Sequence, residues 1–110
     1  MEVSISQHAK AIVVAVKGRM DAATAPTFEH TLADHMAAGV SRVVVDCGAL
    51  EYISSAGLRS LLTTAKTLRV RNGDLVFVGV KDMVREVFEI TGFAAMFSIY
   101  DSIDAALERW

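Results

Sequence analysis

The sequence has little of what would direct it toward a secreted, fibrous or disordered class of protein. It holds one cysteine and one proline among its 110 residues. A single cysteine, Cys47, excludes an internal disulfide and suits a reducing compartment. Because Cys47 directly follows a valine-rich stretch, we expect a buried, inert thiol. The hydrophobic share of 53% also argues against a disordered or low-complexity chain.

Long apolar runs and concentrated positive charge are absent as well. No run approaches the roughly 18 apolar residues that a membrane span needs, and no basic segment followed by an apolar one opens the chain. We therefore expect a cytoplasmic protein that does not insert into a membrane. The formal net charge of −2 lacks the basic face that nucleic acid requires, so no nucleic-acid partner is expected. The length predicts one domain, residues 1–110, and we expect a monomer.

Motifs for catalysis and cofactor binding are missing too. The run Ile53-Ser54-Ser55-Ala56-Gly57 lacks the glycine two residues before the serine that a hydrolase elbow requires. His30 and His35 are five residues apart, off the spacing of a helical metal pair. No Gly-Lys-Ser/Thr motif indicates nucleotide hydrolysis. The sequence therefore predicts no enzyme activity, no cofactor and no metal site.

Strand and helix patterns alternate along the chain. An alternating edge strand and a buried strand are joined near residue 9, and a loop over Gly18–Thr24 leads into an amphipathic helix that ends at Gly39. The remaining expected elements are a strand at Val43–Val45, a loop over Cys47–Ile53, a helix ended by Asn72-Gly73, a strand at Leu75–Val78, a helix capped by Asp82 and closed by Gly92, a short strand at Phe97–Ile99, and a terminal helix from Ile103 to Trp110.

This alternation predicts an α/β fold with a central, mostly parallel sheet of four to five strands, an antiparallel N-terminal edge strand and about four flanking helices. If the strands near residues 11–17, 43–46 and 75–79 are parallel, their following loops leave the sheet at one edge, where sites form in such folds. Asp21 and Ser55 would then lie on one surface.

The stretch from Val43 to Leu62 reads as a buried strand, a loop and two serines, Ser54 and Ser55, at the start of a helix. The first turn of a helix presents unpaired N–H groups and the positive end of the helix dipole, so a phosphate there is tolerated by the fold. A serine at this place is more often a plain N-cap than a modified residue. Both interpretations stay open on the residues alone.

Three blocks, Lys17–Asp21, Ser54–Leu58 and Val84–Phe93, resemble the STAS domain family of bacterial anti-sigma factor antagonists, in its order and spacing. The resemblance implies that Ser55 is the phosphorylated serine and that Asp21 lies at the partner-binding edge. The family pattern is Asp-Ser-Ser/Thr-Gly, so Ser54 replaces the aspartate and Ala56 a hydroxyl, which makes Ser54 a competing acceptor. The resemblance implies that Ser54, Ser55, Ala56 and Gly57 also contact the partner, with Gly57 at a position where the partner's backbone comes close. Without the resemblance, Asp21 is a loop carboxylate that hydrogen-bonds its own backbone.

The resemblance also implies a function. The unmodified protein would bind an anti-sigma factor of the serine-kinase type and free a sigma factor. That kinase would phosphorylate Ser55 with ATP, and a metal-dependent serine phosphatase would restore the active form. The alternative is a regulatory STAS subunit of a membrane anion or lipid transporter.

Overall fold

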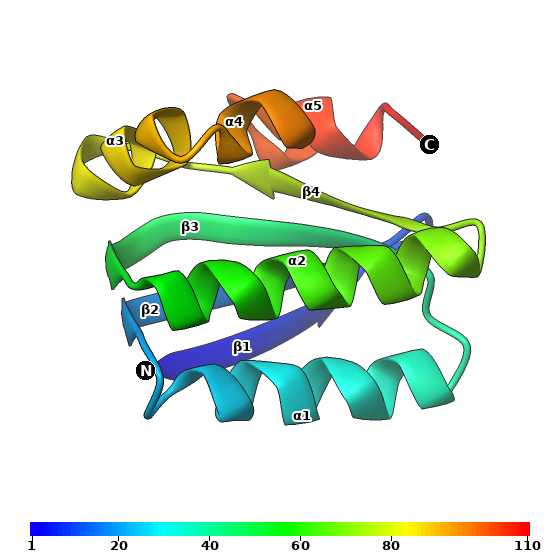
Figure 1. Cartoon of the computed structure of the whole chain (residues 1–110). Helices are drawn as coiled ribbons and strands as arrows, with labels where there is room; N and C mark the ends of the chain where they lie inside the picture. Colours follow the sequence, from blue (N-terminus) through cyan, green and yellow to red (C-terminus); the bar gives the residue numbers. More distant parts are fainter.

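A computed structural model describes residues 1–110 and shows one sheet covered by helices (Figure 1). Strands and helices alternate over most of the chain, as the hydrophobic patterns predict. The elements in chain order are β1 (Glu2–Gln7), β2 (Ile12–Met20), α1 (Ala25–Ala37), β3 (Arg42–Ile53), α2 (Ser55–Val70), β4 (Asp74–Val78), α3 (Asp82–Ile90), α4 (Phe93–Met96), β5 (Ile99–Tyr100) and α5 (Ile103–Leu107).

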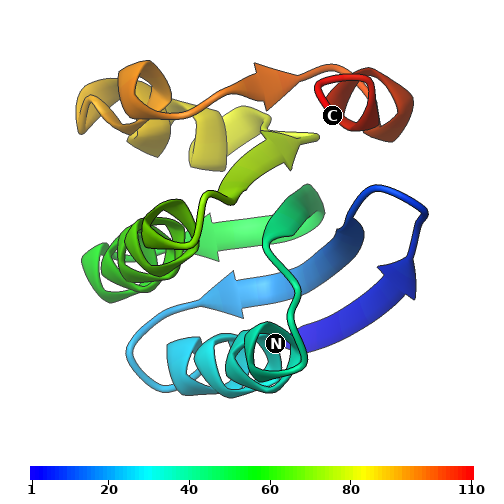
Figure 2. The same cartoon turned by 90° about the vertical axis from the view of Figure 1, so that its right-hand side faces the viewer.

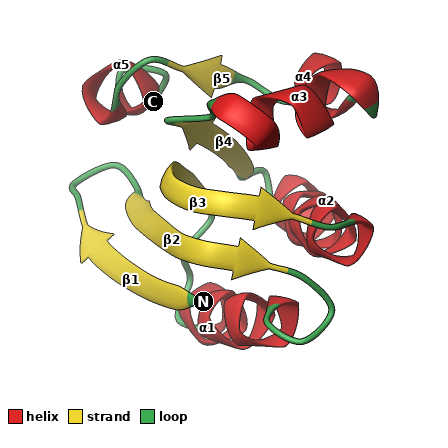
Figure 3. Cartoon of the chain, turned by 90° about the vertical axis from the view of Figure 1, so that its left-hand side faces the viewer, coloured by secondary structure: helices red, strands yellow, loops and turns green.

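The sheet has five strands in the order β1-β2-β3-β4-β5. β1 pairs antiparallel with β2, and every other neighbouring pair is parallel. Helices α1 to α4 cover one face of the sheet, and α5 packs on the other (Figures 2 and 3). This arrangement confirms the predicted fold class, including the antiparallel edge strand at the N-terminus.

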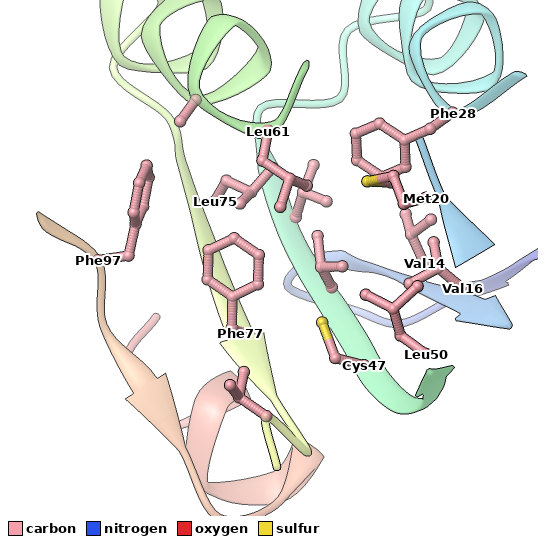
Figure 4. Packing of buried hydrophobic residues seen from close by; sticks show 14 of the residues in the cluster. Val14, Val16, Met20, Phe28, Cys47, Leu50, Leu61, Leu75, Phe77 and Phe97 are labelled. Atoms are coloured by element: carbon pink, nitrogen blue, oxygen red, sulfur yellow. The ribbon is translucent and has the colours of Figure 1, made fainter. Parts of the chain in front are cut away.

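The main core lies between the sheet and helices α1 to α4 (Figure 4). Phe77 on β4 is fully buried, and its ring meets the edges of Phe88 and Phe97 at centroid distances of 5.3 and 5.4 Å. Burying one such side chain stabilises the fold by about 1.5–3 kcal/mol. A smaller cluster on the other face centres on Ala106 of α5 and the valines of β2, β3 and β4. No helix is both long enough and apolar enough to cross a membrane.

The largest departure from the sequence prediction is the length of β3. The expected loop over Cys47–Ile53 is wrong, because β3 continues through Ile53 beside an equally extended β2. Pairing of Lys17 with Ala49 and of Met20 with Ile53 carries the ladder over this stretch, with two register shifts on the way. Backbone hydrogen bonds and bulges therefore hold a strand whose buried residues Cys47, Leu50 and Ile53 recur at every third position instead of every second.

Smaller boundaries also differ. The expected loop from Gly18 begins only after Met20. Lys81 rather than Asp82 is the N-cap of α3, and Asp82 is its first residue with a φ of 52°. The last strand is Ile99–Tyr100, because Phe97 turns into the aromatic cluster and stacks on Phe93. The short α4 raises the number of helices to five.

The thiol of Cys47 is buried in the main core, as predicted. Burial raises its pKa to about 12, with a smaller contribution from the charge of Asp46. An ordinary thiol titrates near 8.5, so the thiolate fraction at about pH 8 falls roughly a thousandfold. We expect native protein to react with a thiol reagent at least about a hundredfold more slowly than protein unfolded in guanidinium chloride. Rapid labelling of the native protein would contradict this burial.

Candidate functional site

The carboxyl ends of β2 and β3 bring the two sequence-predicted segments together. Because the strands are parallel and Met20 pairs with Ile53, both chains leave the sheet at the same edge, on the left in Figure 1. The N–H of Ser54 donates to the carbonyl of Met20 at 2.9 Å. Asp21 directly follows Met20, and Ser55 directly follows Ser54. The predicted proximity of Asp21 and Ser55 is therefore present in the structure.

The two serines occupy different positions at the start of α2. Ser54 is the N-cap, with extended backbone, and its hydroxyl accepts a hydrogen bond from the Gly57 N–H at 3.3 Å. Ser55 is the first helical residue and its side chain is exposed. A long helix follows, with 16 residues, so the first turn offers the positive end of a full helix dipole. Ser54 is thus occupied in capping, whereas Ser55 presents its hydroxyl to solvent.

Gly57 lies where α2 meets the sheet, and it is buried. A Cβ at this position would lie 2.8 Å from the carbonyl oxygen of Met20 and 2.8 Å from a side-chain carbon of Ile53. The backbone and side chains that come close to Gly57 thus belong to β2 and β3 of the same chain. This packing requires a glycine here whether or not a partner protein contacts it. Ala56 beside it is half-buried. Contact of Ala56 and Gly57 with a partner stays a prediction.

Asp21 organises the turn between β2 and α1. Its Oδ1 accepts hydrogen bonds from the N–H groups of Ala23 and Thr24 and from the Thr24 hydroxyl, at 3.0, 3.1 and 3.1 Å. The Thr24 hydroxyl in turn donates to the Arg19 carbonyl at 2.7 Å. Desolvation raises the pKa of Asp21, but these hydrogen bonds and the charge of Arg19 outweigh it, so the pKa lies below its ordinary value. Asp21 is therefore ionised at neutral pH.

This pattern supports the structural role of Asp21 that the residues alone predicted. The hydrogen bonds engage one carboxylate oxygen, and the residue is only half-buried. The negative charge is thus held in place by its own turn and still faces solvent at the edge that carries Ser55. A structural role and a partner-binding role are compatible in this geometry.

Sequence reasoning missed two contacts beside the site. The guanidinium of Arg19 lies 4.0 Å from the ring centroid of Tyr52, a cross-strand pair on β2 and β3. The Ser60 hydroxyl on α2 donates to the carboxylate of Glu29 on α1, and Ser60 is buried. The sequence pattern predicts loops at both Arg19 and Tyr52, so no sequence signal indicates that the two side chains are in contact. Only the parallel extension of β2 and β3 does so.

No three His, Cys, Asp or Glu side chains of the chain come together where they could hold a metal ion. The site consists instead of a free hydroxyl, a fixed carboxylate and a helix N-terminus on one surface. This arrangement can receive a covalent phosphate and present the change in charge to a second protein.

The family model of the STAS domain matches residues 2–106 of the chain. The chain belongs to the STAS domain family. A STAS relative in Bordetella bronchiseptica, BtrV, has the name of an anti-sigma factor antagonist. It is 45% identical over 95 residues, which cover 86% of this chain and 82% of BtrV.

Solved STAS structures agree with the fold. An anti-sigma factor antagonist from Mycobacterium paratuberculosis superposes with a TM-score of 0.87 at 28% identity, over 98% of this chain and 92% of that one. SpoIIAA in its unphosphorylated form matches with a TM-score of 0.84 at 15% identity, over 98% of this chain and 95% of that one. At that identity the SpoIIAA likeness concerns the fold alone.

Proposed function

We propose that this STAS protein is an anti-sigma factor antagonist controlled by phosphorylation of Ser55. Unmodified, it binds an anti-sigma factor that is a serine kinase, and so frees a sigma factor. The kinase then phosphorylates Ser55 and releases the protein. A serine phosphatase removes the phosphate and restores binding.

The observation that carries this proposal is the difference between two adjacent hydroxyls. Ser55 is exposed at the first position of α2, whereas the hydroxyl of Ser54 is half-buried and bound to the Gly57 N–H. Asp21 stands on the neighbouring loop with its charge fixed by its own turn. The names of BtrV and of the Mycobacterium paratuberculosis protein support the same role.

The chemistry requires nothing catalytic from this chain. The Ser55 oxygen attacks the γ-phosphorus of ATP, its proton passes to a base on the kinase, and ADP leaves with the electrons of the broken bond. The product carries about −1.5 to −2 charges beside the N-terminus of α2. The surface thereby changes from one fixed carboxylate to a strongly negative pair of groups.

The proposal predicts one phosphate per chain after incubation with the cognate kinase and ATP, because Ser55 is exposed whereas Ser54 is half-buried and engaged as the N-cap. Ser55→Ala should abolish the added mass. Ser54→Ala is the matched control: it removes the N-cap and costs about 1 kcal/mol of stability, but leaves the acceptor hydroxyl in place. Intact-mass measurement and peptide sequencing give the result. A phosphate on Ser54, or undiminished labelling of Ser55→Ala, would refute the assignment.

Asp21→Asn removes the charge at this edge while it keeps the shape and the acceptor oxygen of the turn. We expect kinase affinity or phosphorylation rate to fall severalfold, with a small loss of stability. The loss has a definite pH dependence: folding lowers the pKa of Asp21 from 3.8, so the charge stabilises the fold above that value and the benefit disappears as the pH falls through the lowered pKa.

Two measurements test this prediction of Asp21→Asn: titration of the variant against the kinase, and denaturant unfolding of variant and wild type from neutral to acid pH. The difference in unfolding free energy should be present at neutral pH and shrink in acid. If the variant keeps the wild-type affinity and phosphorylation rate, Asp21 has only its structural role in the turn.

A further inference from the structure

A second candidate site lies at the end of the sheet opposite Ser55, on the right in Figure 1. The β1–β2 hairpin, the loop before β3 and the turn after α2 line an open hollow of about 530 Å³. The polar side chains along it include Gln7, His8, Lys10, Arg42, Arg71 and Asn72. This hollow is distant from the phosphorylation edge and plays no part in the function proposed above.

The charges around this hollow are of one sign. Lys10, Arg42 and Arg71 line it together with the imidazole of His8, and no carboxylate does. The net charge of the whole chain is −2, so this concentration of positive charge is not a general property of the surface. Clustered like charges repel one another and are stabilised by a bound anion.

None of these basic groups has a carboxylate partner. The ion pairs of the chain are Arg69–Asp74, Arg85–Glu89 and Arg109–Asp74. Asp104 and Glu108 line an adjoining cavity that shares His8 and Lys10, and they form no ion pair with either. Asp74, the strand partner of Arg42, is paired with Arg69 and Arg109. The cations at this end therefore keep donors that a ligand can use.

Part of the cluster is held in place. Arg71 donates to the carbonyl of Met36 at the end of α1, at 2.7 Å, which leaves its remaining N–H groups free. The Met36 carbonyl also accepts from the N–H of Gly39, and the two carbonyls before it accept from the N–H groups of Ala38 and Val40. The negative end of the α1 dipole is thus partly satisfied within the chain. The C-terminal end of α1 therefore disfavours a bound anion less than an uncapped helix end would.

We infer that this hollow binds a small polyanion that carries two or more phosphate groups, held by Lys10, Arg42 and Arg71 with His8 and Asn72 as further donors. Its size exceeds that of one phosphate, and its cations come from three separate segments of the chain, so several linked charges fit better than one. Arg42 and Arg71 offer the forked donors that suit phosphate oxygens.

The test uses inorganic pyrophosphate and tripolyphosphate as probes, titrated into the full chain at constant ionic strength, with orthophosphate and sodium chloride for comparison. Calorimetry measures affinity. Trp110, the only tryptophan, gives a second readout: the Arg42 guanidinium lies 6.0 Å from its ring centroid, so an Arg42 that turns to the ligand changes the indole emission. Amide chemical shifts locate the ligand.

We expect saturable binding of both probes, with shifts confined to residues 8–11, 38–42 and 71–72. The double variant Lys10→Gln, Arg42→Gln should lower affinity at least about tenfold with an unchanged melting temperature, because both side chains are exposed. The double variant Lys17→Gln, Lys66→Gln, an equal loss of two charges at exposed positions of β2 and α2 outside the hollow, should change affinity less than about twofold. Absence of saturation, an unaffected double variant, or shifts centred on Ser54–Gly57 would overturn the inference.

Discussion

Phosphorylation of Ser55 is expected to lower affinity for the proposed anti-sigma factor kinase by at least about a hundredfold, while the domain stays folded. The new dianion must be desolvated in a closed interface, and it adds to the fixed charge of Asp21 on the same edge. Together these effects cost on the order of several kcal/mol. A loss of about 2.8 kcal/mol is already a factor of one hundred.

Inside the isolated domain the same phosphate is favourable. It lies beside the N-terminus of α2, a position worth about 0.3–1 kcal/mol to an anion. Arg59 follows four residues later on the same helix and is exposed, so a phosphate–arginine pair adds about 0.2–0.5 kcal/mol. Folding and binding thus respond to the phosphate with opposite signs.

Paired measurements separate the two effects. The melting temperature of the phosphorylated and unmodified domain is compared first, and each form is then titrated against nucleotide-bound kinase that cannot transfer phosphate. The first comparison should show little change or a slight rise, and the second a large loss. Equal affinities of the phosphorylated and unmodified forms would refute the switch mechanism. A collapsed melting temperature would show that affinity was lost through unfolding instead of at the interface.

Gly57→Ala is expected to destabilise the fold by about 1–3 kcal/mol, because the new methyl group collides with the Met20 carbonyl and with Ile53. Helix propensity predicts the opposite sign, since alanine in a helix is favoured over glycine by up to about 1 kcal/mol. The sign of the change therefore decides between crowding and propensity. The collision involves backbone, which cannot rotate away, so we expect crowding to dominate.

The matched control for Gly57→Ala is Gly48→Ala on β3, where the nearest atom to an added Cβ is a carboxylate oxygen of Asp46 at 3.1 Å. That side chain is able to shift, so the loss there should be under about 1 kcal/mol. Denaturant unfolding measures both. Phosphorylation of Gly57→Ala should also slow, because relief of the collision moves the start of α2 away from β2. A stabilised variant would show that the packing at Gly57 is loose.

The sequence by itself determined the fold class, whereas the choice of Ser55 as the candidate phosphorylation site came from the resemblance to the STAS family. Buried valine runs such as Val43–Val45 could only be strands within a covered sheet, and the amphipathic spacing of the helices required them to pack on it. Local chemistry also placed two serines at a helix start, since N-caps depend on residues a few positions apart. These signals are short-range, and the linear order of residues contains them.

Only the tertiary structure decided which serine is free and why Gly57 is a glycine. The extension of β2 and β3 to Met20 and Ile53 depends on pairing between segments more than thirty residues apart, and bulges within it leave no regular pattern to read. That pairing sets the Met20 carbonyl against both Ser54 and Gly57. The opposite basic hollow arises likewise, because a hairpin, the start of β3 and the turn after α2, far apart in the sequence, meet where the parallel strands begin.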